Sequence, residues 1–168
     1  MCPGGGSFVA PPLGVDVGEV WFCWNPFSTR LCPVVDLRRR VLVIDDQPGF
    51  RAFLQRILEV DGYCVDVAED GDAGLAVLAD ASRPCVVLVD LLMPGVNGIG
   101  FITRLRDRYG SNRFPVIVIS ALFGGEDVEP PDLPGVRGVI GKPFEPRVVR
   151  AAVRHAWATL EQREQPAA

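Results

Sequence analysis

Polar side chains that can take part in chemistry stand at the ends of four apolar runs in this sequence. They are Asp45, Asp46, Asp90, Ser120 and Lys142. Asp90 is the clearest case, because the run Val86–Val89 before it contains no polar residue and reads as a fully buried strand. A charge where a buried strand emerges is costly unless it is neutralised or used. These positions therefore predict a functional site.

The residue types indicate chemistry on phosphate. Three carboxylates brought together repel one another unless a cation compensates, and Mg²⁺ is a hard ion that prefers oxygen ligands and keeps positions open for phosphate. With the metal and the Lys142 ammonium holding phosphoryl oxygens, a carboxylate such as Asp90 can attack phosphorus and form an aspartyl-phosphate. The Ser120 hydroxyl would then donate a hydrogen bond to the phosphoryl group.

Each residue alone has a structural explanation. Asp45 and Asp46 could cap a helix beginning at Pro48, Ser120 could satisfy a strand end, and Lys142 could be a surface charge. All of them at successive strand ends favour a site. Lys142 is also the only lysine among 17 basic residues, which suggests a position that needs a compact ammonium instead of a guanidinium.

The elements that would position these residues alternate along the chain. Strands are expected at 41–44, 63–67, 85–90, 116–119 and 139–140, and helices from Pro48 to Gly62, from Asp70 to about Ala81, after Gly98 and from Pro146. This order predicts a parallel sheet covered on both faces, a doubly wound α/β fold whose strand ends meet at one edge. Prolines and glycines between Ser120 and Val139 leave room for at most a turn or two of helix there.

Composition narrows the class of protein. The chain is 48% hydrophobic and 23% charged, which argues against global disorder. A net charge of −4 gives no general attraction to nucleic acid or an anionic membrane. Neither a transmembrane stretch nor a secretory leader is recognisable, so the cytoplasm is the expected location.

The two ends and the cysteines complete the sequence organisation. Residues 1–37 are rich in Gly, Pro and aromatics without periodicity, and we interpret them as a disordered extension or a misassigned start; a partner-binding aromatic segment is the alternative. Residues 38–160 form the expected domain and 161–168 a tail.

Cys64 and Cys85 are expected to be buried small hydrophobes. Cys2, Cys23 and Cys32 match no zinc-binding spacing.

The sequence resembles the receiver domain of two-component response regulators over about residues 39–160. The matching motifs are Val43-Ile44-Asp45-Asp46-Gln47-Pro48, Val89-Asp90-Leu91-Leu92-Met93-Pro94-Gly95-Val96-Asn97-Gly98, Ile119-Ser120-Ala121 and Gly141-Lys142-Pro143-Phe144. The resemblance implies a flavodoxin-like fold with a five-stranded parallel sheet in the order 2-1-3-4-5 and a shortened or irregular fourth helix.

The resemblance also implies a role for each site residue. Asp90 would be the phosphoacceptor, with Ser120 and Lys142 as the other catalytic side chains. The donor would be a phosphohistidine on a histidine kinase or a histidine phosphotransfer protein. His155 lies in the last expected helix, away from the site, so the phosphate must come from outside the chain.

The metal of this family would be Mg²⁺. By resemblance, Asp46, Asp90 and the backbone carbonyl of Leu92 would ligate the ion directly. Asp45 would act on it through water.

The sequence departs from the family at three places. Val139 replaces an aromatic residue whose inward turn reports phosphorylation, and a β-branched aliphatic cannot swing in the same way. The Pro/Gly-rich segment 122–135 replaces a helix of the face through which many receivers signal. Leu92 and Leu122, each two residues past a site residue, are apolar, and we hypothesise that they slow hydrolysis of the phosphoryl group.

The leading interpretation is a single-domain receiver that signals by protein–protein contact, without direct DNA binding and without enzyme activity beyond its own phosphotransfer and dephosphorylation. The alternative is a receiver-fold binding module that works without phosphorylation. A dehalogenase-like phosphatase would need Asp-x-Asp after its first strand, which Asp45-Asp46-Gln47 does not supply. No Gly-x-Gly-x-x-Gly follows that strand, which argues against dinucleotide binding.

Overall fold

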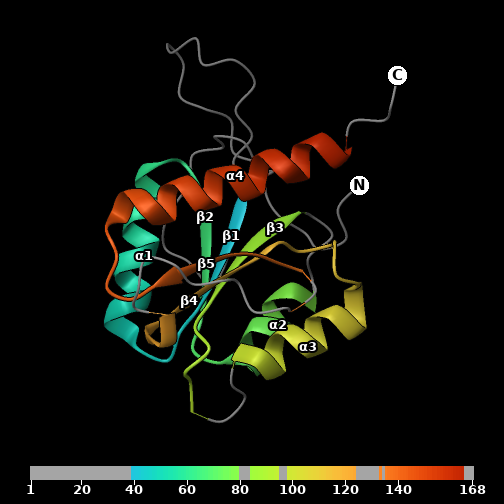
Figure 1. Ribbon diagram of the computed structural model, residues 1–168, viewed down its shortest axis with the longest axis horizontal. Coiled ribbons are helices and arrows are strands. Elements are labelled where there is room, and N and C mark those ends of the chain that lie inside the picture. Colours follow the sequence, from blue (N-terminus) through green and yellow to red (C-terminus); the bar gives the residue numbers. More distant parts are fainter. Residues whose placement is uncertain (1–38, 80–83, 95–97, 124–132, 134, 165–168) are drawn as a thin grey trace, which may run out of the picture. The chain divides into compact units, whose positions relative to one another are not determined.

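Strands and helices alternate along the chain in the computed structural model, which describes residues 39–79, 84–94, 98–123, 133 and 135–164 (Figure 1). The strands are β1 (Arg40–Ile44), β2 (Cys64–Ala68), β3 (Cys85–Val89), β4 (Val116–Ser120) and β5 (Val136–Gly141). The helices are α1 (Pro48–Val60), α2 (Gly71–Ala79), α3 (Gly98–Tyr109), α4 (Pro146–Glu164) and the short 3₁₀ helix η1 (Ala121–Phe123).

The five strands form one parallel sheet in the order β2-β1-β3-β4-β5. Helices α1 and α4 cover one face of the sheet, and α2 and α3 cover the other (Figure 1). The predicted doubly wound fold and its strand order are confirmed.

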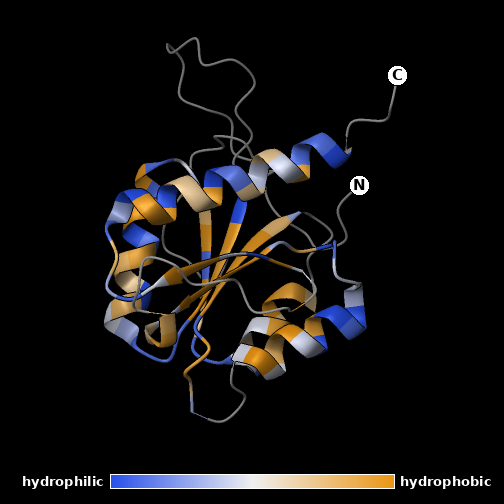
Figure 2. Cartoon of the chain, in the orientation of Figure 1, coloured by the Kyte–Doolittle hydropathy of each residue, from blue (hydrophilic) through white to orange (hydrophobic). Residues whose placement is uncertain are grey.

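Alternate residues of each strand belong to different halves of the core. Val41 and Val43 of β1 pack in the half under α1 and α4. Leu42 and Ile44 pack in the half under α2 and α3. Because successive side chains point to opposite faces and both faces are covered, the central strands β1, β3 and β4 are apolar except for Arg40 at the start of β1 and Ser120 at the end of β4, and Figure 2 colours them mostly hydrophobic.

Strand β5 contains one extra residue relative to β4. Val116 pairs with Val136, but the next residue, Ile117, pairs with Gly138, so Arg137 has no partner in the register. This β-bulge is followed by regular pairing up to Ser120 with Gly141. The strand is longer than the predicted 139–140, and Lys142 follows it directly.

The helix starts agree with the capping signals of the sequence. Asp70 caps α2, because its Oδ1 accepts a hydrogen bond of 2.8 Å from the backbone N–H of Ala73. Pro48 is the first residue of α1, where a proline costs no hydrogen bond.

The connection between β4 and β5 holds the three residues of η1 in its described part. The rest of the Pro/Gly-rich segment, 124–132 and 134, lies outside the described residues, as does the predicted extension 1–37. Helix α4 continues to Glu164, so the first four residues of the predicted tail at 161–168 belong to this helix. Among the described helices, none is long and apolar enough to cross a membrane.

One burial prediction needs correction. Cys85 is buried as expected, but Cys64 is exposed, because β2 is an edge strand whose first residue is not covered. The other three cysteines lie outside the described residues.

The two described cysteines should differ sharply in reactivity. In a variant with Cys2, Cys23 and Cys32 changed to Ser, a thiol reagent at neutral pH should modify Cys64 in the folded protein and Cys85 only after unfolding. Burial raises the pKa of the Cys85 thiol to about 12, so little of the reactive thiolate forms. Burial also keeps the reagent away from the sulfur. Mass spectrometry after timed labelling measures this, and equal labelling of both thiols in the folded protein would contradict the described burial.

Candidate functional site

The predicted site residues converge at the carboxyl edge of the sheet. Asp45 follows β1, Asp90 follows β3, Ser120 ends β4 and Lys142 follows β5. Backbone hydrogen bonds continue past the strands and tie these ends together: the N–H of Asp90 donates to the carbonyl of Ile44 at 3.0 Å, and that of Lys142 donates to the carbonyl of Ser120 at 3.0 Å. The site is therefore fixed by the pairing of the strands themselves.

The ammonium of Lys142 bridges two buried carboxylates. Its Nζ lies 2.8 Å from Asp45 Oδ2 and 2.7 Å from Asp90 Oδ2, and these aspartates are only 1% and 4% exposed. Burial by itself lowers the pKa of Lys142, but the hydrogen bonds and charges of Asp45 and Asp90 outweigh it and hold that pKa above its usual range. The two carboxylates therefore favour the charged ammonium form of Lys142.

The second oxygen of each bridged carboxylate is also held. Asp45 Oδ1 accepts a hydrogen bond of 2.9 Å from the N–H of Gln47, and Asp90 Oδ1 accepts one of 2.9 Å from the N–H of Leu92. Both donors belong to the turn that follows the strand. The two carboxylates are thus oriented by backbone groups as well as by the lysine.

Asp45, Asp46 and Asp90 each offer one oxygen within 4.8 Å of the others. Asp46 Oδ1 is buried and has no hydrogen-bond partner among the described residues. Buried polar atoms usually have a partner, so this oxygen is available to bind a ligand. Three carboxylates and one ammonium leave a formal charge of −2 at the site. This donor set fits a hard divalent cation such as Mg²⁺.

Ser120 is completely buried at the end of β4. Its Oγ accepts a long hydrogen bond of 3.4 Å from the N–H of Leu122. The position at the carboxyl edge is the predicted one, and the role of the hydroxyl stays a prediction. The same holds for the Leu92 carbonyl as a metal ligand.

Gly98 is a positioning residue that we did not single out from the sequence. A Cβ at this position would lie 2.2 Å from the carbonyl oxygen of Asp90 and 2.8 Å from the Cα of Leu91. Only glycine therefore lets the start of α3 approach the backbone of Asp90. The signal was present, because glycine closes the matching motif around Asp90, but a motif alone does not say what a side chain would strike.

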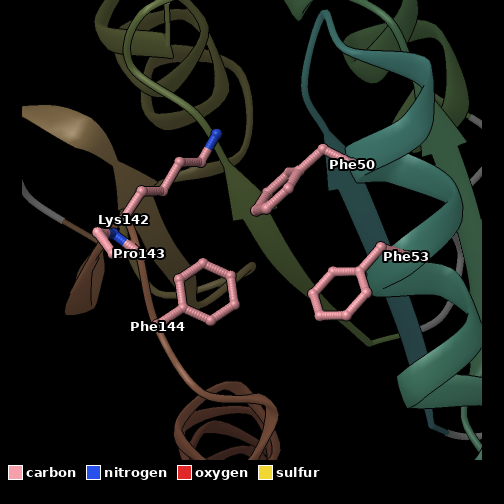
Figure 3. A pocket seen from close by; sticks show the side chains of 5 residues that line it. All are labelled: Phe50, Phe53, Lys142, Pro143 and Phe144. Atoms are coloured by element: carbon pink, nitrogen blue, oxygen red, sulfur yellow. The ribbon is translucent and has the colours of Figure 1, made fainter.

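An aromatic pocket beside Lys142 was also not predicted from the sequence. It has a volume of about 380 Å³ and is lined by Phe50, Phe53, Lys142, Pro143 and Phe144 (Figure 3). The Lys142 Nζ lies 4.0 Å from the centre of the Phe50 ring. The sequence alone could not show that the Phe50 ring faces a charge.

These features define a flavodoxin-like α/β protein with an acidic site and one lysine at the carboxyl ends of its strands. A model of the response regulator receiver domain matches residues 41–154, well over half of the 168 residues. The chain belongs to this family.

Curated relatives agree with this assignment. The chain is 34% identical over 118 residues to the DNA-binding response regulator MtrA of Mycolicibacterium smegmatis, covering 70% of this chain and 50% of MtrA. It is 30% identical over 155 residues to the cyclic di-GMP phosphodiesterase response regulator RpfG of Xanthomonas campestris, covering 91% of this chain and 39% of RpfG. The chain thus spans about half or less of the length of these relatives.

Solved structures give the same fold. The receiver domain of a Francisella response regulator aligns with a TM-score of 0.64 at 28% identity, covering 73% of this chain and 98% of that one. The response regulator TrrA of Thermotoga maritima, solved in complex with Mg²⁺-BeF, aligns with a TM-score of 0.59 at 25% identity, covering 70% and 98%.

Changing Gly98 to Ala should damage the site through the backbone. The added methyl group meets main-chain atoms that cannot turn aside, so we expect the free energy of unfolding to fall by about 1–3 kcal/mol. Gly49→Ala is the matched control, because a Cβ there has nothing within 4 Å and alanine favours the helix. Urea unfolding of both variants tests this, and equal midpoints would show that the close approach at Gly98 does not exist.

Proposed function

We propose that this receiver accepts a phosphoryl group on Asp90. The observation that carries the proposal is the bridge from the Lys142 ammonium to Asp90 and Asp45 beside the partnerless oxygen of Asp46. A lysine held against an acidic cluster provides positive charge where phosphoryl oxygens would arrive, next to a carboxylate oriented for attack. Membership of the receiver family supports the same assignment.

The proposed transfer forms one bond to phosphorus and breaks another. An oxygen of the Asp90 carboxylate forms a bond to phosphorus while the P–N bond of the donor phosphohistidine breaks. The electron pair of that bond stays with the imidazole, which takes up a proton as it leaves. The product is an acyl phosphate on Asp90.

Lys142 would hold an oxygen of the transferred group, and Ser120 would donate a hydrogen bond to another. The Lys142 Nζ lies 2.7 Å from Asp90 Oδ2, which supports this role for the lysine. Asp45, Asp46, Asp90 and the Leu92 carbonyl would hold Mg²⁺. When bound, the ion would neutralise charge on the phosphoryl oxygens.

The donor would be a histidine kinase or a phosphotransfer protein, and the receiver would act in the cytoplasm by contact with another protein. His155 is exposed on α4 and does not belong to the site at the carboxyl edge, so it supports no internal transfer. DNA binding and phosphodiesterase activity are properties named for relatives that this chain covers only in part.

A second candidate is a receiver-fold binding module that needs no phosphorylation. It is favoured by Val139, which packs half-buried against the core under α2 and α3, where it offers no ring that could turn. The complete set of acidic residues and Lys142 favours phosphorylation instead.

Incubation with Mg²⁺ and acetyl phosphate should place one acid-labile phosphate on the unmodified protein and none on the Asp90→Asn variant. The amide cannot form an acyl phosphate, so the added mass should disappear entirely. Intact-protein mass spectrometry measures the result. Asp107→Asn is the control, because this exposed carboxylate on α3 pairs with Arg106 away from the site.

If the unmodified protein gains no phosphate under these conditions, phosphoacceptance fails and the binding-module function takes its place. Phosphate that persists in Asp90→Asn but disappears in a variant of another aspartate would instead move the acceptor.

The phosphorylated state should be long-lived. Leu92 and Leu122 are 51% and 60% exposed, and their apolar side chains offer no hydrogen bond to a water that attacks phosphorus. Leu92→Asn should therefore speed the loss of phosphate severalfold, whereas Val148→Asn, an exposed apolar position on α4, should leave it unchanged. Decay of the phosphorylated mass over time provides the measurement, and fast decay that none of these changes affects would refute the role of the leucines.

A further inference from the structure

The contact between Lys142 and Phe50 is the closest approach of a cation to an aromatic ring among the described residues. The Lys142 Nζ lies 4.0 Å from the ring centre, against 5.3 Å for Arg108 over Tyr109 and 5.7 Å for Arg113 over Phe114. Those two contacts join sequence neighbours. The contact of Phe50 joins α1 to the residue after β5, so the tertiary fold creates it.

The ring completes the surroundings of the ammonium. Two sides of Lys142 Nζ are taken by the carboxylates of Asp45 and Asp90, and the Phe50 ring lies against it as a third contact. Lysine has a long side chain that loses conformational entropy when it is fixed in one position. The negative face of an aromatic ring attracts a cation and helps to offset this cost.

Phe50 is itself held in place by other rings. Phe144 packs against it edge to face, with ring centres 5.7 Å apart and planes at 73°, and Phe53 lies 6.1 Å away on the same helix. Figure 3 shows the three rings gathered beside the Lys142 side chain. Phe53 packs against Phe50, and the ring that lies under the Lys142 Nζ is that of Phe50. The ring that contacts the ammonium is therefore itself packed against two other rings.

We propose that Phe50 is a positioning residue for phosphotransfer, which holds the Lys142 ammonium toward Asp90 through the face of its ring. This inference rests on the proposed function and deepens it. Any ligand that engages the oxygens of Asp45 leaves the ammonium with one carboxylate fewer, and the long lysine side chain gains freedom to turn away. The ring keeps its hold, because its attraction does not depend on a carboxylate.

The first test observes the contact without any phosphate or metal. Lys142 is the only lysine of the chain, so incorporation of ¹³C-lysine gives a single set of side-chain NMR signals. The ε-methylene protons should be shifted upfield by the ring, and Phe50→Leu should abolish this shift. Phe53→Leu is the matched control, which removes the neighbouring ring and should preserve the shift.

The second test separates the charge of the ring from its shape. Phenylalanines with one, two and three fluorine atoms, incorporated at position 50, progressively weaken the negative face while the ring stays nearly the same size. The rate of phosphorylation by acetyl phosphate, in which the bond from phosphorus to acetate breaks as the bond to Asp90 forms, should fall at each step. Phe50→Leu should slow it about fivefold, with Phe53→Leu unchanged.

The outcomes distinguish the two proposals. If the unmodified protein takes up phosphate and the rates stay flat across the fluorinated series, the role of Phe50 is overturned and the proposed function stands. If the upfield shift is absent, the contact itself is refuted. If no form of the protein takes up phosphate although the shift is present, the proposed function fails, and the positioning role fails with it.

Discussion

The bridge of one ammonium between two buried carboxylates is the interaction on which the site depends. Asp45 and Asp90 are both buried, and removing the partner of a buried carboxylate costs on the order of 3–5 kcal/mol. Lys142 supplies the positive charge from β5, which is separated from β1 by two other strands. The strand order, the length of β5 and the reach of a lysine side chain are all required for this contact.

Much of this arrangement could be predicted because parallel sheets impose a simple rule. Strands buried on both faces are apolar throughout, so a polar residue after such a run marks the edge where ligands bind. Asp90 and Ser120 could be placed in this way from their own neighbourhoods. The order of the strands could not be derived from periodicity and came from the resemblance of the motifs.

Contacts between distant side chains could not be predicted in the same way. Nothing around Phe50 in the sequence distinguishes a ring that faces a lysine from one that faces leucines, since the apolar spacing is the same. Cys64 was predicted wrongly because the exposure of a strand's first residue depends on its place in the sheet. The role of Gly98 could not be predicted from the sequence, since it depends on how close the backbone of Asp90 lies.

The β-bulge at Arg137 determines to which face of the sheet the later side chains of β5 point. Side chains alternate between the two faces of a sheet with a period of two, so one extra residue in β5 reverses which face every later side chain addresses. A strand without that residue would present Lys142 on the opposite side and leave the carboxylates to a neutral neighbour. The single extra residue of this edge strand, four residues before the pairing with β4 ends at Gly141, thus decides whether the positive charge reaches the two carboxylates.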